Sequence, residues 1–430
     1  ARNRRQGEPA SMTEVAISTD PRGRIFITPE AFADMDAWHA TAAEIRRDEP
    51  VMRVEAEGWT PFWAITKHAD VFEVSRRSDV FFNTEKSAPG PDLQYDMLQA
   101  FGIELPRTLV HIHGDVHNKL RSVTNDWFKP AAVRHLQPTI ESIADEFVDK
   151  MAAMDGRCDF AADVAQPFTI RVIMSIFGVP QSDEPLMLSL TQGLFGAADP
   201  EYMGDFSDPL AAITSSINRF EEYFDALSDE RRENPTDDLA TVIANGMVDG
   251  APMGDRERLW YYIIVATAGH DTTSFALSGG LERLLAHPDQ LRAVQDDPTL
   301  AGAAAEEMIR WTTPVRSFMR WAQADTEIGG VPIAAGDAVL TSYPSANRDE
   351  DVFVDPMRFD IGRPDADQLL SFGLGMHYCL GSQVARREVR TLLAKVLERV
   401  DTIELDGEPA WSGAHFVSGV KHLPIRYTLR

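Results

Sequence analysis

The stretch that decides the fold is Ser371-Phe372-Gly373-Leu374-Gly375-Met376-His377-Tyr378-Cys379-Leu380-Gly381. Its glycines surround one cysteine and let the backbone approach a flat object closely. A helix is expected to begin directly afterwards, so the positive end of its dipole favours the thiolate of Cys379. Such a thiolate fits a nucleophile or a metal ligand, and a small buried residue in a glycine-rich turn is the plainer alternative. Zinc is disfavoured because no second cysteine or close histidine pair completes a tetrahedral set.

Size, charge and cysteine content exclude several classes of protein. The chain has 430 residues, with 41 Lys+Arg against 67 Asp+Glu and a formal net charge of −26. Phosphate backbones and anionic membranes repel so acidic a chain, so neither nucleic acid nor a membrane is expected as a partner. The two cysteines, Cys158 and Cys379, argue against a disulfide scaffold and suit a reducing cytoplasm.

The apolar periodicity predicts one large, mainly α domain with small β-sheets. Residues 1–29 are expected to form a flexible N-terminal tail, and residues 30–430 a single domain. The β-rich part is expected at about 48–67, 320–345 and 415–430. The helical part is expected at about 116–312 and 382–400. Residues 87–106 are expected to be a long loop, and residues 416–429 a hairpin.

The longest expected helix opens near Asp255 and runs to Ala286, before Pro288 stops it. At 1.5 Å per residue it would be roughly 48 Å long. Its interior contains Ala268-Gly269-His270-Asp271-Thr272-Thr273, in which a glycine and paired threonines cost helix stability. Function is expected where a local rule is broken in mid-helix, and a satisfied core pair of threonines is the plainer alternative.

The spacing Phe372-x-x-Gly375-x-x-x-Cys379-x-Gly381 resembles the haem-binding loop of the cytochromes P-450. In that family the cysteine thiolate is the axial ligand of the haem iron. The resemblance implies this role for Cys379, haem b as cofactor and O2 as co-substrate, with Phe372, Gly375 and Gly381 contributing to the haem site. It runs through most of the chain in the family order and is strongest to the bacterial α-terpineol hydroxylase branch. The implied fold buries the haem between a long distal helix and the proximal cysteine loop.

The resemblance also assigns roles to the helix motif and to three charged residues. It implies that Gly269 opens space for dioxygen, and that Thr272 and Asp271 form the alcohol/acid pair that delivers protons. The Glu307-x-x-Arg310 pair resembles the family's Glu-x-x-Arg, with Arg363 as the third partner. Such a triad would be scaffolding for the haem loop, although alone an i,i+3 pair is worth only a few tenths of a kcal/mol.

The haem propionates need cationic donors. By position in the family pattern the candidates are His117, Arg121, Arg320 and His377. For any one of them a solvent-facing charge is the plainer alternative, but four together are harder to dismiss.

Electrons must come from another protein, because the chain has no flavin, nicotinamide or iron–sulfur motif. In soluble bacterial relatives the donors are a small acidic ferredoxin and its NADH-dependent ferredoxin reductase. A basic patch would be needed to dock such a partner. The candidates flank the haem-side helices: Lys119, Lys129, Arg134, Arg386, Arg387 and Arg390.

The substrate is expected to be a small hydrophobic molecule, either a terpenoid or an aromatic hydrocarbon, hydroxylated at a C–H bond; a steroid is the alternative. The expected pocket residues are Leu98, Phe101, Val265, Ala268, Val315, Phe318, Phe416 and Val417. An inward-pointing Arg316 would change that expectation by offering an anchor for carboxylates.

The leading hypothesis is therefore a cytoplasmic haem-thiolate monooxygenase. A peroxide-driven haem-thiolate enzyme is an alternative, which Thr272 and Asp271 disfavour because peroxide already carries the protons they would supply. A non-catalytic haem sensor or carrier is another alternative. A metal-free cysteine hydrolase would need histidine and aspartate residues placed around Cys379.

Overall fold

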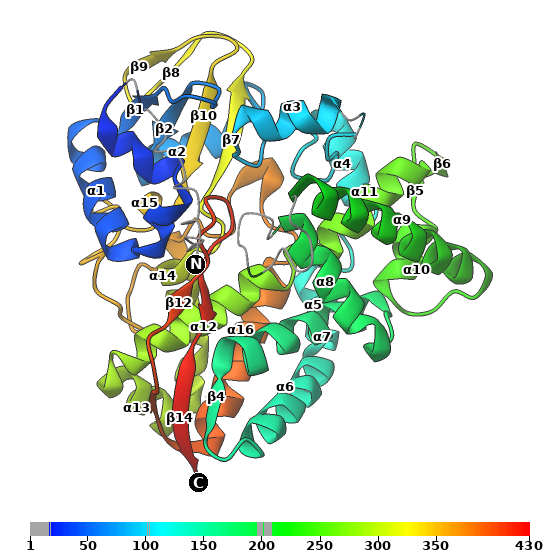
Figure 1. Ribbon diagram of the computed structural model, residues 1–430, viewed down its shortest axis with the longest axis vertical. Helices are drawn as coiled ribbons and strands as arrows, with labels where there is room; N and C mark the ends of the chain where they lie inside the picture. The colour runs from blue at the N-terminus through cyan, green and yellow to red at the C-terminus, as the bar shows by residue number, and fades with distance from the viewer. Residues whose placement is uncertain (1–16, 18, 101, 103, 196–200, 202–208) are drawn as a thin grey trace, which may run out of the picture.

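The fold combines a sheet-rich corner with a larger helical body (Figure 1). It was analysed in a computed structural model, which describes residues 17, 19–100, 102, 104–195, 201 and 209–430. The largest sheet lies at the upper left of Figure 1, and the helical body extends below it and to the right. The mainly helical, single-domain fold class predicted from the sequence is confirmed.

Segments from both ends of the chain build the main sheet, whose strand order is β1-β2-β10-β7-β3. Its strands are β1 (Val51–Val54), β2 (Phe62–Ile65), β3 (Phe81–Phe82), β7 (Ser317–Ala322) and β10 (Ala338–Ser342). Strand β10 pairs in parallel with β2 and antiparallel with β7. The sheet therefore ties the N-terminal β1–β2 hairpin to the segment that precedes the cysteine loop.

The smaller sheets are built from the remaining strands. These are β4 (Arg157–Asp159), β5 (Met247–Val248), β6 (Ala251–Pro252), β8 (Thr326–Ile328), β9 (Val331–Ile333), β11 (Val400–Leu405), β12 (Ala410–Trp411), β13 (Val420–His422) and β14 (Pro424–Leu429). The hairpin expected at residues 416–429 is wrong, because β13 pairs with β12 whereas β14 pairs with β11 and β4. Local alternation shows that strands exist but does not select their partners.

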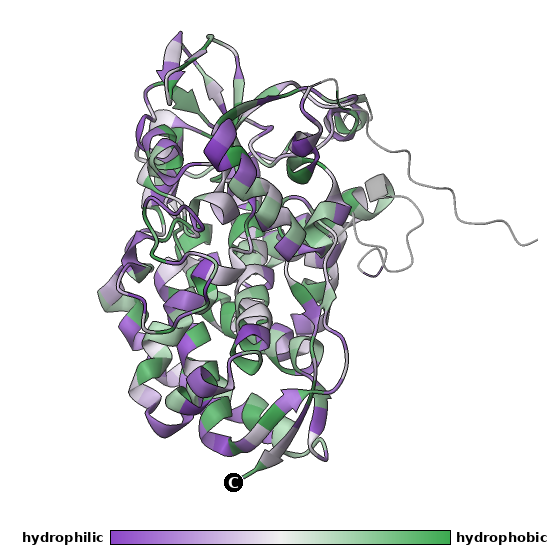
Figure 2. Ribbon diagram, turned by 90° about the vertical axis from the view of Figure 1, so that its left-hand side faces the viewer, coloured by the Kyte–Doolittle hydropathy of each residue, from purple (hydrophilic) through white to green (hydrophobic). Residues whose placement is uncertain are grey.

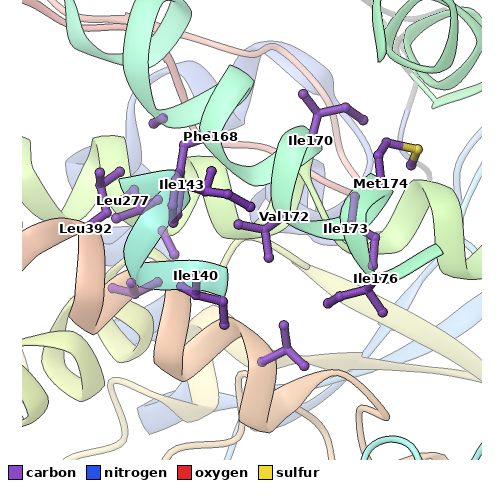
Figure 3. Close-up of a cluster of buried hydrophobic side chains, with 14 of the residues drawn as sticks. Ile140, Ile143, Phe168, Ile170, Val172, Ile173, Met174, Ile176, Leu277 and Leu392 are labelled. Carbon is purple, nitrogen blue, oxygen red and sulfur yellow. The ribbon is translucent and has the colours of Figure 1, made fainter. Parts of the chain in front are cut away.

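The helical body buries one continuous apolar core. Its helices, with those that flank the sheets, are α1 (Met35–Asp48), α2 (His68–Arg76), α3 (Asp92–Ala100), α4 (Gly114–Ser122), α5 (Pro130–His135), α6 (Gln137–Ala152), α7 (Gln166–Phe177), α8 (Glu184–Phe195), α9 (Pro209–Glu233), α10 (Leu239–Ala244), α11 (Asp255–Ala268), α12 (Asp271–Leu285), α13 (Pro288–Asp296), α14 (Ala301–Thr312), α15 (Tyr343–Ala346) and α16 (Ser382–Arg399). Polar and apolar residues alternate along them, as expected of helices that bury one face (Figure 2). Figure 3 shows side chains from four of them meeting in that core, such as Ile140 (α6), Phe168 (α7), Leu277 (α12) and Leu392 (α16).

Three expectations need correction. The long helix is two helices, α11 and α12, separated at Gly269 and His270. The expected loop 87–106 contains α3. The expected tail does not extend to residue 29, because Pro21–Phe26 form a 3-10 helix that buries Ile25 and Phe26; residues 1–16 and 18 lie outside the described part.

One helical stretch, Phe160–Phe177, is long and apolar enough to cross a membrane by length and composition alone. Within the fold, however, 67% of it is buried. A core helix of a soluble protein has the same character, so this stretch is weak evidence for a membrane span.

Candidate active site

The cysteine loop is held against α2 by glycine geometry. Gly373 and Gly375 have φ values of 65° and 69°, in the left-handed region that favours glycine. A Cβ at Gly375 would collide with the backbone oxygen of Ser75, which lies in α2. The Cys379 N–H donates to the Phe372 carbonyl over 2.8 Å and closes the loop. Gly381 has an ordinary φ of −83° and precedes the first residue of α16.

Cys379 lies deep in the protein, yet its side chain is exposed to an internal cavity. Burial raises the pKa of its thiol, although the Gly381 N–H and the charges of Arg121 and Arg386 act in the opposite direction. The backbone N–H groups at the start of α16 favour the thiolate, as the sequence predicts, but in the protein alone the effect of burial is larger. A bound metal cation would stabilise the thiolate directly.

The break between α11 and α12 forms another part of the cavity wall. A Cβ at Gly269 would lie 3.1 Å from the side chain of Ile173 in α7. This glycine therefore allows α7 to pack closely on the break, a role that sequence reasoning missed. Gly269 also lines the cavity beside Thr272.

Thr272 and Asp271 begin α12, but only Thr272 lines the cavity. The Thr272 hydroxyl donates to the Ala268 carbonyl over 3.0 Å and so bridges the helix break. The Asp271 carboxylate instead lies 3.2 Å from Nε2 of His270, whose side chain is completely buried. The alcohol faces the cavity, and the acid lies behind it.

The cavity has an empty volume of about 1550 Å³, part of it open to solvent. It reaches from Cys379, Phe372, His377 and Gly381 on one side to the α11–α12 break on the other. Four of the expected substrate residues line it, namely Val265, Ala268, Val315 and Phe318. Sequence reasoning missed others that line it, among them Asn83, Leu109, Val110, Ile173 and Ile264.

The other expected pocket residues need correction. Phe416 and Val417 do not line the cavity; Val417 forms a bridge to Val315, and the Phe416 ring meets Phe318 edge-on at 5.3 Å. They support the wall from behind. Leu98 is buried in the main core and does not reach the cavity, and Phe101 lies outside the described residues.

Arg316 points away from the cavity. Its guanidinium donates to the carbonyl oxygens of Thr312, Thr313 and Ser418 over 2.8 to 3.1 Å. Burial lowers its pKa to about 9. It helps to satisfy the carbonyl end of α14 and offers no anchor to a ligand in the cavity.

The four expected propionate donors gather at one end of the cavity, and all four line it. The rings of His117 and His377 lie 4.3 Å apart, and Arg121 donates to the Tyr378 carbonyl over 2.8 Å. Burial lowers the pKa of His117 to about 4 and also lowers the pKa values of Arg320 and His377. Within the described residues, no carboxylate forms an ion pair with Arg121 or Arg320.

These residues fit a haem. Nε2 of His117 is buried and has no hydrogen-bond partner, which is costly unless a ligand supplies one. Two arginines without carboxylate partners and an orphaned imidazole suit the two carboxylates of a haem. The cavity that Cys379 lines has space for its ring.

The charged triad lies below the cysteine loop and is completely buried at its centre. Both carboxylate oxygens of Glu307 accept from Arg310 over 2.7 Å, and one also accepts from Arg363 over 2.8 Å. Arg310 also donates to the Asn347 carbonyl over 2.7 Å, and the Asn347 amide donates to Ser371 over 2.9 Å. The triad is thereby connected to the first residue of the cysteine loop.

The six basic candidates for docking divide into two groups. Three have a carboxylate partner: Lys119 with Asp249, Lys129 with Asp126, and Arg386 with Glu306. The others are Arg134, Arg387 and Arg390, which have no ion pair among the described residues. The pKa of Arg387 is lowered by burial and by the charges of Arg390 and Arg134, which places the three together.

Comparison with known proteins identifies the family. The model of the family "Cytochrome P450" matches residues 46–410. Cytochrome P450-terp from a Pseudomonas species is 37% identical over 94% of this chain and 97% of its own length. A steroid C26-monooxygenase from Mycolicibacterium smegmatis is 32% identical, over 93% and 95% respectively.

Solved structures agree with this assignment. CYP108D1 from Novosphingobium aromaticivorans has a TM-score of 0.88 at 40% identity and covers 95% of this chain and 98% of its own. A Mycobacterium marinum cytochrome P450 in complex with pseudoionone has a TM-score of 0.85 at 30% identity, with 95% and 100% coverage. The chain belongs to the cytochrome P450 family, is a monooxygenase, and uses a haem-thiolate cofactor and O2.

Proposed function

We propose that Cys379 is the axial ligand of the haem iron and that the enzyme hydroxylates a small, uncharged hydrophobic substrate. One observation carries this proposal: Cys379 and Thr272 line the same cavity. His117, Arg121, Arg320 and His377 then hold the propionates at its edge. The triad of Glu307, Arg310 and Arg363 keeps the cysteine loop in place.

The haem, when bound, supplies the activation of dioxygen, and the protein supplies position and protons. The Thr272 hydroxyl lies at the cavity wall, and because it donates its hydrogen to the Ala268 carbonyl, its lone pairs can accept a proton from a neighbouring group. Asp271 lies next to it and beside His270, so it can return a proton to Thr272 from behind the wall. A short alcohol–acid relay of this kind keeps bulk water away from the reacting centre.

The cavity wall supports a hydrocarbon substrate. Its distal part is formed mainly by Ile173, Ile264, Val265, Ala268, Val315 and Phe318. The charge of Arg316 is directed elsewhere, so a carboxylate would have no partner there. The names of the relatives point to a terpene oxidase, to steroid C26-monooxygenases and to methyl-branched lipid ω-hydroxylases. We favour a terpenoid or an aromatic hydrocarbon over a steroid.

The electron donors are a small acidic ferredoxin and an NADH-dependent ferredoxin reductase, in the cytoplasm. Arg134, Arg387 and Arg390 support this choice, because they form a local positive patch on a protein of net charge −26. Charge reversal by Arg390→Glu is expected to slow reduction by ferredoxin and to reduce its dependence on salt. An unchanged rate and salt dependence would remove this patch from docking.

The test of the ligand assignment is the absorption spectrum of the reduced, CO-bound enzyme. The wild type and the matched control Cys158→Ser are expected to show the red-shifted band of a thiolate-ligated haem. Cys379→Ser is expected to lose that band. A thiolate spectrum that survives in Cys379→Ser would refute the assignment.

The peroxide-driven and sensor alternatives are separated by turnover. With ferredoxin, reductase and a hydrocarbon panel, the wild type is expected to consume NADH and form product. Thr272→Ala is expected to consume NADH and release peroxide. Turnover with peroxide alone, unaffected by Thr272→Ala, would favour the peroxide-driven enzyme. Substrate binding without any turnover would favour a sensor or carrier.

A further inference from the structure

His113 is a functional candidate that the sequence motifs do not include. It is the residue before α4, the helix that carries His117 and Arg121. Its Nε2 lies 2.7 Å from the Ser78 carbonyl, and its Nδ1 lies 3.3 Å from Nε2 of His377. It therefore joins the start of α4 to the cysteine loop.

The hydrogen bonds of His113 define its protonation pattern. The backbone N–H of Asn83 donates to Nδ1 over 3.3 Å, so Nδ1 carries a lone pair. The proton of the neutral ring is then on Nε2, which donates to the Ser78 carbonyl. Consequently Nδ1 also accepts from Nε2 of His377, and the two equal distances of 3.3 Å fit one lone pair shared by two donors.

Packing holds the His113 ring in this position. The ring is stacked on Phe82 of β3, with 4.1 Å between centroids and 23° between planes. The next ring in line is His377, whose centroid lies 5.5 Å away, followed by His117 at 4.3 Å from His377. Burial and the charge of Arg320 lower the pKa of His113, in agreement with a neutral ring.

We propose that His113 is a positioning residue for the propionate end of the haem site, acting by holding the ring of His377. This inference rests on the placement of the propionates among His117, Arg121, Arg320 and His377 given above. The acceptor atom Nδ1 is the essential feature, because its bond to Nε2 fixes the orientation of the His377 ring, which lies between the rings of His113 and His117. The bonds to Ser78 and Asn83 anchor His113 itself to the segment around β3.

Two substitutions distinguish the role of the His113 Nδ1 acceptor from the packing of the His113 ring. His113→Phe keeps an aromatic ring against Phe82 and removes both nitrogens. His113→Asn loses the ring, but its amide oxygen can occupy the position of Nδ1. The matched control is His111→Phe, since His111 is a neighbouring half-buried histidine that bonds to Thr108 over 2.8 Å and forms no bond to His377.

The measurements are haem release to excess apomyoglobin, the reduction potential of the haem, and the melting temperature of each holoenzyme. Loss of one neutral hydrogen bond predicts that His113→Phe releases haem ~3- to 10-fold faster. Its reduction potential is expected to shift as well, because a loosened His377 changes the surroundings of the propionates. His113→Asn is expected to recover most of both properties, and His111→Phe to change neither.

Each other outcome counts against the proposal in a defined way. The proposal would be overturned if His113→Phe released haem at a rate within twofold of the wild type and had the same reduction potential within experimental error. Equal defects in His113→Phe and His113→Asn would also overturn it, because the acceptor would not matter. His117→Phe serves as the reference for the site: if it too leaves haem release unchanged, the placement of the propionates fails, and the inference fails with it.

Discussion

Replacing Glu307 by Gln tests whether the buried triad supports the cysteine loop. The side chains of Glu307 and Arg310 are both 0% exposed, so this substitution keeps the shape and removes the carboxylate charge that bonds to Arg310. Arg363 retains a second carboxylate, Asp365, at 2.7 Å. The loss therefore falls on Arg310, which becomes a buried cation without a carboxylate bonded to it.

The size of the effect follows from the burial. Removing one partner of a buried ion pair costs about 3–5 kcal/mol. An unfolding entropy of about 2.1 cal/mol/K per residue over 430 residues gives roughly 0.9 kcal/mol/K. Glu307→Gln should therefore lower the melting temperature by about 3–6 °C.

The neighbouring residue provides the control. Glu306 pairs with Arg386 at 2.7 Å, but the two side chains are 27% and 26% exposed. An ion pair of this kind is worth about 0.2–1 kcal/mol, so Glu306→Gln should shift the melting temperature by about 1 °C or less. Differential scanning calorimetry of both holoenzymes, together with the fraction of thiolate-type CO spectrum, measures the comparison. Equal melting temperatures for the two variants would refute the reasoning.

Three further predictions concern the cysteine loop, the rear of the cavity and a buried acid. Gly375→Ala should abolish haem incorporation, seen as a lost Soret band, because its Cβ collides with the Ser75 carbonyl. Arg316→Leu should lower the melting temperature by leaving carbonyls such as that of Ser418 unpaired, yet keep substrate dissociation constants within twofold in spin-shift titrations. Burial raises the pKa of Glu388 well above its usual 4.5, so the neutral form of this side chain is the one that the fold stabilises, and that stability is lost as pH rises. Glu388→Gln should therefore have a higher melting temperature than the wild type at pH 8 and the same melting temperature at pH 4.

The parts of the site that the sequence could predict are those whose residues lie close together in the sequence. Cys379, Gly375 and His377 lie within one loop, and His117 and Arg121 lie four residues apart on one helical face. Their chemistry follows from local spacing, and the structure brings them to one cavity. The same is true of Glu307 and Arg310, which form an ion pair and are only three residues apart in the sequence.

The remaining features depend on contacts between distant segments. His113 and His377 are in contact although they are 264 positions apart in the sequence. The sequence around either residue contains no motif that predicts this contact. Asn83 and Leu109 line the cavity from the segments that precede and follow the loop expected at residues 87–106. Phe416 and Val417 are predicted to line the pocket, but they pack behind residues that line it. Alternation along a strand-like segment does not show which neighbouring segment it will contact.

The helix break combines both situations and can be tested by a double substitution. The composition of the break is unusual for a helix interior and could be recognised from the sequence. A larger residue is disfavoured at position 269 because an added Cβ would lie 3.1 Å from the side chain of Ile173. Gly269→Ala should therefore destabilise the holoenzyme by about 1–3 kcal/mol through overpacking, and Ile173→Ala alone by about 2–5 kcal/mol through its cavity. In the double variant the overpacking disappears, so the two effects should fall short of additivity by at least ~1 kcal/mol. Additive losses in the melting temperature would mean that Gly269 is required by the cavity side of the break, as the sequence resemblance implied, and not by the packing of α7.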